Sequence, residues 1–223
     1  MVLGLGPYIH ACRIRAFLLS TKKIMWPLLI ITPAILVFCD YMKAPIDLLY
    51  FTNIWRPVVG MQNTLRDVFK PHHFHPGLLL LKLHYKKIRE EFLKVSPTLK
   101  HEYYHDLDPW FEKNMNYYYY KVKHFPILYG LIKQISCTCE FAERAAFAVV
   151  DGPMTIAPHR AESNELLRYH LTIQSDGDCT LYTESGSHVH VDGDDFIFDH
   201  ARYHELVKTG PGRRVVLILD IHR

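Results

Sequence analysis

The sequence has little cysteine and little net charge, and each shortage argues against a class of protein. Its five cysteines include no Cys-x-x-Cys pair, which argues against a structural zinc ribbon. The formal net charge is only +3, and beyond the N-terminus the two signs alternate, so nothing indicates a nucleic-acid partner. A chain of 223 residues is long enough for one domain with an appendage, or for two small domains.

Acidic residues are also missing from the basic N-terminal segment, residues 1–23, and charge of either sign is missing from residues 24–39. A spanning helix needs about 20 apolar residues, with about 17 as the lower limit, so this run is marginal. We predict a single N-terminal membrane-anchor helix. Its end, Val37-Phe38-Cys39, lacks the small residues of a cleavage site, which favours a retained signal-anchor. A cleaved signal sequence and a buried helix are the alternatives.

The charges that flank this run predict its orientation. Four basic residues precede it, and only Lys43 and Arg56 follow it closely. By the positive-inside rule, the N-terminus is cytoplasmic and the C-terminal domain lies across the membrane, in the endoplasmic reticulum lumen if the source is eukaryotic.

The middle of the chain divides into a linker, residues 40–76, and a helical, aromatic-rich support, residues 77–143. The linker's histidines beside prolines indicate a solvated loop. An apolar stripe at helical spacing predicts an amphipathic helix, formed by Leu81, Tyr85, Ile88, Phe92 and Val95. Its other face is expected to be solvated and carries Lys86, Lys87, Arg89, Glu90 and Glu91. Tyr117–Tyr120 is interpreted as a loop packed on the following domain, and residues 126–135 as a second short helix.

From residue 144 to the end, short β-type runs alternate with turns rich in Gly, Asp and Pro. The runs are residues 145–150, 166–173, 179–183, 188–191, 195–198 and 214–221. Many short strands with turns between them indicate an antiparallel sandwich or barrel. The predicted fold class is therefore mainly β with flanking helices: a double-stranded β-helix (a cupin-like jelly roll) over residues 144–223, preceded by the anchor helix.

Five residues of this domain carry the chemistry. In a jelly roll, His159 and His204 can face each other across the barrel mouth, and two converging imidazoles suit Fe(II). Arg168 and His170 share one face of a strand, where burial favours an anionic ligand. Arg214 opens an otherwise apolar strand and could hold a second carboxylate. Each residue alone is more often structural, so the prediction depends on the set.

Two other groups of residues could form a metal site instead. His188, His190 and Asp192 alternate on one strand, but beside a Gly turn they are better interpreted as a solvated hairpin face. His200 and His204 have helical spacing, yet the surrounding β pattern argues against a helix.

Three motifs make the set specific: PHRAESNELLRYHL at 158–171, FDHARYHEL at 198–206 and RVVLILD at 214–220. Together they resemble the aspartyl/asparaginyl β-hydroxylase family, whose members are Fe(II)- and 2-oxoglutarate-dependent dioxygenases on a double-stranded β-helix. The motifs cover about a third of the chain, from Ala145 to Asp220, while residues 80–143 are compatible but carry no motif.

The resemblance implies a role for each residue. His159 and His204 look like the iron ligands, Arg168 and His170 look like partners of the co-substrate's 1-carboxylate, and Arg214 looks like the partner of its 5-carboxylate. Most 2-oxoglutarate oxygenases add an acid two residues after the first histidine. The family resembled lacks this acid, and Ala161 here agrees with that. Asp199 and His200 are near enough in sequence to hold an iron-bound water without contacting the metal themselves. One departure is Ala148, where the family has a serine that helps to hold the 5-carboxylate.

The reaction implied is the hydroxylation of an unactivated carbon with O2, in which 2-oxoglutarate yields succinate and CO2. The implied substrate is the β-carbon of Asp or Asn residues in a protein. A lipid acyl chain is the alternative substrate, since the family also includes members that hydroxylate lipids. A non-catalytic cupin-like binding module is the third hypothesis, and it predicts no succinate and no dependence on His159 or His204.

Overall fold

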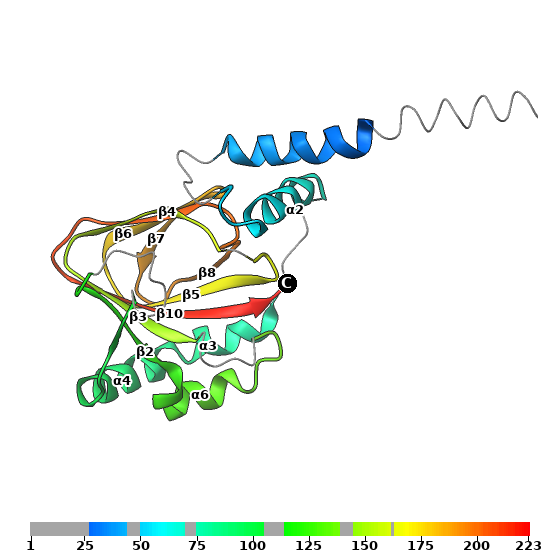
Figure 1. The fold of residues 1–223 in the computed structure, drawn as a ribbon. Helices are drawn as coiled ribbons and strands as arrows, with labels where there is room; N and C mark the ends of the chain where they lie inside the picture. The colour runs from blue at the N-terminus through cyan, green and yellow to red at the C-terminus, as the bar shows by residue number, and fades with distance from the viewer. Residues whose placement is uncertain (1–26, 44–49, 70–74, 105–113, 139–144, 162) are drawn as a thin grey trace, which may run out of the picture. The chain divides into compact units, whose positions relative to one another are not determined.

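The computed structural model describes residues 27–43, 50–69, 75–104, 114–138, 145–161 and 163–223 (Figure 1). Predictions made for the basic segment 1–23, for His72 and for His73 lie outside the described residues. The chain divides into two compact units, Met1–Lys70 and Pro71–Arg223, and each is described by itself.

The first unit contains a helix over residues 27–41 and a second helix, α2 (Trp55–Phe69). Every residue from 27 to 35 is exposed, although none of them is charged. At the other end of this helix Asp40 is buried and accepts a hydrogen bond of 3.0 Å from the Tyr50 hydroxyl. Among the residues that the structure describes, none of the helices has the length and apolar character that a membrane crossing requires.

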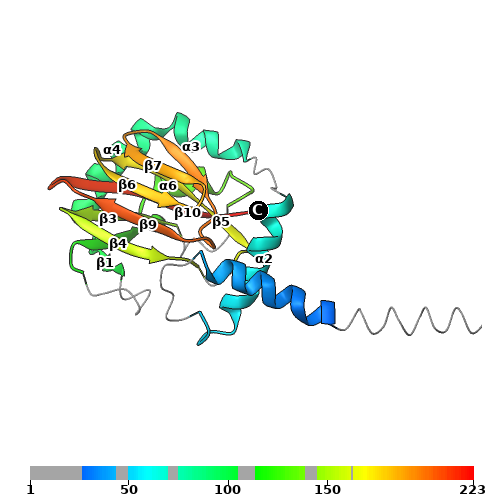
Figure 2. The same cartoon turned by 90° about the horizontal axis from the view of Figure 1, so that it is seen from above.

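The second unit is a sandwich of two antiparallel sheets (Figures 1 and 2). The larger sheet has the order β1-β2-β3-β10-β5-β8, and the smaller has the order β4-β9-β6-β7. The strands are β1 (Glu102–Tyr103), β2 (Tyr117–Lys121), β3 (Ala146–Asp151), β4 (Met154–His159), β5 (Leu166–Gln174), β6 (Asp176–Thr183), β7 (Gly186–Val191), β8 (Asp195–Phe198), β9 (His204–Lys208) and β10 (Arg213–His222). This jelly-roll-like architecture confirms the predicted β fold.

Helices cover the outer face of the six-stranded sheet (Figures 1 and 2). They are α3 (Leu79–Leu83), α4 (Tyr85–Val95) and α6 (Pro126–Ile132), with the short 3-10 turns Pro76–Leu78, Ser96–Thr98 and Val122–His124. The predicted apolar stripe is confirmed, because Leu81, Ile88 and Phe92 are buried in the core against this sheet. The predicted single helix is divided at His84, which lies between α3 and α4.

One residue of the face predicted to be solvated is buried. The carboxylate of Glu91 accepts hydrogen bonds from the backbone N–H groups of Ile127 and Leu128, at 2.7 and 2.9 Å. These are first-turn N–H groups of α6, which have no partner within the helix. Glu91, on α4, therefore supplies the hydrogen-bond acceptor for the first N–H groups of α6. Its prediction as a solvated residue is wrong.

A second correction concerns the tyrosine run. Tyr117–Tyr120 forms strand β2 instead of a loop, paired with β3 and β1. Aromatic side chains favour strands because they pack well on a pleated, half-buried surface. Strands β4 and β9 were also absent from the predicted β runs.

The two faces of the six-stranded sheet differ in what they contact. Along β5, Leu167, Tyr169 and Leu171 belong to the core beneath the helices. The alternate residues Arg168 and His170 therefore point the other way, into the space between the two sheets. We call this space the barrel interior; its apolar lining includes Ala148, Val150, Cys179, Leu181, Phe198, Leu206, Val216 and Ile218.

Candidate active site

The two predicted iron ligands lie directly opposite each other. His159 ends β4 and His204 begins β9, and the two residues are register partners. Their ring centroids are 4.2 Å apart. The pairing of β4 with β9 is irregular between Ile156 and His159, where Pro158 interrupts the ladder. The sheet thus brings together two histidines that are 45 residues apart in the chain.

Both rings are held through the same nitrogen. Nδ1 of His159 lies 2.9 Å from the carbonyl oxygen of Ala157, and Nδ1 of His204 lies 2.9 Å from that of Arg202. A carbonyl oxygen only accepts, so each Nδ1 carries the proton and each Nε2 carries the lone pair. Burial lowers the pKa of His204 well below its usual value, with a further contribution from nearby His159. His204 is therefore neutral and able to bind a metal.

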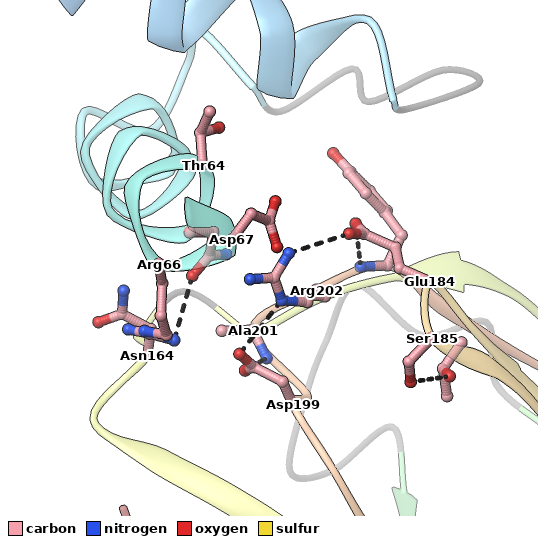
Figure 3. A network of polar contacts seen from close by, with 12 residues as sticks. Thr64, Arg66, Asp67, Asn164, Glu184, Ser185, Asp199, Ala201 and Arg202 are labelled. Carbon is pink, nitrogen blue, oxygen red and sulfur yellow. Dashed lines mark hydrogen bonds and ion pairs between the residues drawn. The ribbon is translucent and has the colours of Figure 1, made fainter. Parts of the chain in front are cut away.

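A turn held by ion pairs precedes His204, and Figure 3 shows its residues Asp199, Ala201 and Arg202 together with Glu184. The carboxylate of Asp199 accepts hydrogen bonds from the backbone N–H of Ala201 and from Nε of Arg202. Arg202 also donates to Glu184, which accepts a second bond from the backbone N–H of Tyr203. The turn is not helical, so the pair His200–His204 does not have helical geometry.

Asp199 and His200, the two residues predicted to hold an iron-bound water, have different surroundings. Asp199 is engaged by Arg202 and also by Arg223, so it holds the turn and the C-terminus. His200 is buried, and its Nδ1 has no hydrogen-bond partner. Burial lowers the pKa of His200 to about 4, helped by the charge of Arg168. Of the two, His200 has the free buried nitrogen that a bound water could use.

Aromatic rings connect the histidine pair with the opposite end of the barrel interior. Phe198 lies 5.1 Å from the ring of His204 and 5.0 Å from the ring of His170. The ring of His170 lies 5.8 Å from that of His190, whose Nε2 is 3.1 Å from a terminal nitrogen of Arg214. A chain of side-chain contacts through Phe198 and His190 therefore links the predicted residues His159, His204, His170 and Arg214.

The two arginines of the barrel interior have different kinds of partner. Arg168 makes a two-point ion pair with Asp220, with nitrogen–oxygen distances of 2.9 and 3.3 Å. Arg214 is 1% exposed and donates a hydrogen bond to the neutral acceptor His190, while its Nε has no hydrogen-bond partner among the described residues. Burial lowers the pKa of Arg214, which is the expected response of a cation without a paired anion. A buried charge in this condition is costly unless a ligand supplies the opposite charge.

His190 overturns the prediction of a solvated hairpin face. It is fully buried, and it accepts a hydrogen bond from Arg214 because a guanidinium can only donate. Burial, aided by the charge of Arg214, lowers the pKa of His190 to about 2. Among the described residues, no group of three or more His, Cys, Asp or Glu side chains could hold a metal, so His188, His190 and Asp192 do not form one.

Three interior residues were missed by the sequence reasoning. Asp220 belongs to the third motif but was given no role. An acidic residue in an otherwise apolar strand indicates a buried partner of opposite charge. His190 was assigned to the wrong face. Thr172 follows Arg168 and His170 at the same two-residue spacing, which would have placed it on their face.

The profile of the family described as Aspartyl/Asparaginyl beta-hydroxylase matches residues 82–223. The chain belongs to this family. The match includes every predicted site residue, and it extends the resemblance from the last third of the chain to the helices α4 and α6. As an Asp/Asn β-hydroxylase family member, the chain is assigned to a family of hydroxylase enzymes.

No curated protein sequence matches this family member closely enough to count as a relative. Solved structures resemble it only weakly. KdgF from Halomonas sp. is 15% identical with a TM-score of 0.33, over 54% of this chain and 94% of that one. A predicted oxalate decarboxylase from Thermotoga maritima is 14% identical with a TM-score of 0.30, over 36% of this chain and 70% of that one. Likenesses of this size carry no argument about activity.

Proposed function

We propose that this hydroxylase-family protein depends on Fe(II) and 2-oxoglutarate and uses O2 as its oxidant. The observation that carries the proposal is that the two ends of the barrel interior present different polar groups. One end presents two oriented imidazoles, and the other presents a buried arginine without a carboxylate. Neutral imidazoles suit Fe(II), and a dicarboxylate would supply the missing negative charge.

The residues present fit both groups. His159 and His204 would hold the metal through Nε2, because their backbone hydrogen bonds fix the tautomer. Both ring nitrogens of His170 are buried without a partner, as is Nε of Arg214. A neutral imidazole has one donor nitrogen, so His170 and Arg214 each offer a donor without a partner, one for each end of a dicarboxylate. When bound, iron and 2-oxoglutarate supply oxidising chemistry that releases succinate and CO2 and hydroxylates an unactivated carbon.

Each residue then has a defined task in binding or orientation. His170 would donate an N–H to the 1-carboxylate, and burial lowers its pKa so far that it stays neutral. Arg168 would add positive charge at the same end, although Asp220 already engages two of its N–H groups. Arg214 would bind the 5-carboxylate. Nδ1 of His200 would hold a metal-bound water, and Asp199 would keep the turn in place.

The proposed substrate is the β-carbon of Asp or Asn residues in a protein, and its support is the family to which the chain belongs. A lipid acyl chain is the second candidate. It is favoured by the helix at residues 27–41, whose first nine described positions are exposed and uncharged. Mass spectrometry of products from Asp- and Asn-containing peptides and from lipid vesicles would decide between these substrates.

The same helix supports a proposal about location. We propose that residues 24–39 anchor the protein in a membrane as a single N-terminal segment, with the N-terminus cytoplasmic and the second unit on the far side. An uncharged helix surface is stable where lipid surrounds it. Thiol labelling of the exposed Cys39 tests this, because lipid vesicles should protect it from a polar reagent. Labelling that is unchanged by vesicles would contradict the anchor.

An anaerobic titration tests the enzymatic proposal. Fe(II) and then 2-oxoglutarate are added to the full-length protein, and the visible metal-to-ligand charge-transfer band is followed. The band should be absent in His159→Ala and His204→Ala, and it should require much more 2-oxoglutarate in Arg214→Met. If folded wild-type protein gives no band, the non-catalytic cupin-like module becomes the better description.

A further inference from the structure

We propose that the hydroxyl group of Thr172 is a second hydrogen-bond donor to the carboxylate that Arg214 binds, and so helps to select a dicarboxylate co-substrate. This inference rests on the proposed function, since it assigns a further residue to the same ligand. It starts from the burial of Thr172, which is 0% exposed while its Oγ1 has no hydrogen-bond partner in the part of the chain that the structure describes. A buried hydroxyl in this state is rare in native proteins and points to a missing ligand.

The position of Thr172 on β5 directs its side chain into the barrel interior. Leu171 and Ile173, on either side of it, both belong to the core beneath the helices. Side chains alternate along a strand, so Thr172 points the opposite way, together with Arg168 and His170. It is thus the third polar residue on the face that lines the proposed co-substrate site.

The sheet register places Thr172 beside Arg214. Thr172 pairs with Val216 on β10, and Arg214 precedes Val216 by two residues on the same face. Such diagonal neighbours lie within reach of long side chains. The β5–β10 ladder shifts register between Val215 and Val216, so Arg214 and Thr172 are diagonal neighbours across this irregularity. A bulge of this kind redirects side chains and is frequent beside active sites.

The far side of this cluster is closed by His190. The turn after β7 is tied to Thr172 by two backbone hydrogen bonds of 2.9 Å, to the carbonyl of Asp194 and from the N–H of Gly193. His190, on β7, accepts from Arg214 at 3.1 Å. Arg214 is therefore oriented by a neutral ring, and the backbone of Thr172 is fixed by the turn that follows the strand of that ring.

The opposite flank of Val216 offers no donor. Val216 pairs with Ala148 on β3 as well as with Thr172 on β5, so the three residues form a row across the sheet. Ala148 is buried in the interior and has only a methyl group. A hydroxyl is thus available on one flank of Val216 and not on the other, which makes Thr172 the donor that supplements Arg214.

The test measures the dissociation constant of 2-oxoglutarate in the anaerobic Fe(II) titration, using full-length Thr172→Val, which keeps the shape and removes the hydroxyl. A hydrogen bond to a charged group is worth enough to expect about tenfold to hundredfold weaker binding. Thr172→Ser should stay close to wild type, and so should Thr155→Val, which removes a hydroxyl from an exposed position on β4. In Thr172→Val, the further change Ala148→Ser should recover part of the affinity.

A ligand without the distal carboxylate makes the assignment specific. 2-Oxopentanoate has a methyl group in its place, so Thr172→Val should bind it as wild type does. Equal losses for both ligands would show a structural effect and overturn the inference; Thr172→Ala, measured with both ligands, serves if Thr172→Val fails to fold. Unchanged 2-oxoglutarate binding in Thr172→Val, with weakened binding in Arg214→Met, would overturn the inference alone. No binding by wild type would overturn the proposed function as well.

Discussion

The two faces of the six-stranded sheet are built from the same strands and yet have opposite characters. On the helix side, β5 and β10 present only apolar or aromatic side chains: Leu167, Tyr169, Leu171, Ile173, Val215, Leu217, Leu219 and Ile221. On the interior side the same two strands present Arg168, His170, Thr172, Arg214 and Asp220. Because successive side chains of a strand point to opposite faces, each strand contributes alternately to an apolar core and to a set of polar groups.

This difference separates folding from function within one element. On the helix face the hydroxyl of Tyr169 is satisfied by Asp195 and the other side chains are apolar, so this face stabilises the fold through burial. The interior face carries polar atoms without partners on His170, Thr172 and Arg214, which weakens the unliganded protein. Unsatisfied groups that persist in a native structure are expected at functional sites, where a ligand completes them. The comparison predicts that mutations on the two faces will affect stability and binding in different combinations.

A large loss of stability is expected for Asp220→Ala, which breaks the ion pair between Asp220 and Arg168 in the barrel interior. Arg168 would keep a buried charge without an anion, and removing one partner of a buried pair costs about 3–5 kcal/mol. We expect about 3 kcal/mol, because the Arg168 side chain retains 21% exposure. Urea unfolding followed by circular dichroism measures it. The control is Arg213→Ala, whose partner Asp151 lies in an exposed pair worth less than about 1 kcal/mol. Equal losses would contradict the difference between the two pairs.

Leu217→Ala tests the helix face alone. Leu217 is fully buried beneath the helices, so the lost packing should lower the free energy of unfolding by about 2–5 kcal/mol. The affinity of the folded fraction for 2-oxoglutarate should not change, because the side chain points away from the site. The neighbouring Val216→Ala should show the reverse: a smaller loss of stability together with weaker binding. A large loss of affinity in Leu217→Ala would mean that the two faces are coupled.

Arg214→Met should separate stability from function most clearly. Replacing a buried charge that lacks an anion with an apolar side chain of similar length is expected to raise the free energy of unfolding, by about 1–4 kcal/mol. The same change should remove most affinity for 2-oxoglutarate. Thermal unfolding with and without 2-oxoglutarate measures both effects. A destabilised Arg214→Met protein would indicate that Arg214 has a structural role instead.

Much of this architecture could be predicted from the sequence, and the failures have physical causes. Runs of β-branched and apolar residues predicted β3, β5, β8 and β10 closely. Strand β4 contains Pro158, and β9 is short and carries charged residues, so neither has a clean β pattern. These two strands carry His159 and His204. The order of the motifs predicted that the two histidines form a pair, although neither strand was predicted.

Alternation along a strand predicts which residues share a face, but it does not predict which face is buried. His188 and His190 were correctly grouped, yet the burial of His190 depends on Arg214 from the opposite sheet. Glu91 is a similar case, since its partners are backbone groups of a helix 36 and 37 residues later. Polar residues buried by distant partners are the part that a local pattern cannot provide.

His190→Gln should reduce the dependence of stability on pH, an effect that is small near neutral pH and grows on acidification. The pKa of His190 is lowered to about 2 in the folded protein, whereas an unfolded histidine titrates near 6.5. As pH falls below 6.5, the unfolded chain gains a proton that the folded protein refuses, so stability decreases on acidification. Between about pH 6 and pH 4 this one residue contributes a slope approaching 1.4 kcal/mol per pH unit.

His190→Gln keeps an acceptor for Arg214 and removes the titration. Its free energy of unfolding should therefore decline less steeply over this range than that of Ser187→Ala, a control on the exposed hairpin. Parallel declines in the two variants would show that His190 already binds a proton in the folded protein, and the account of Arg214 as a cation facing a neutral ring would then be wrong.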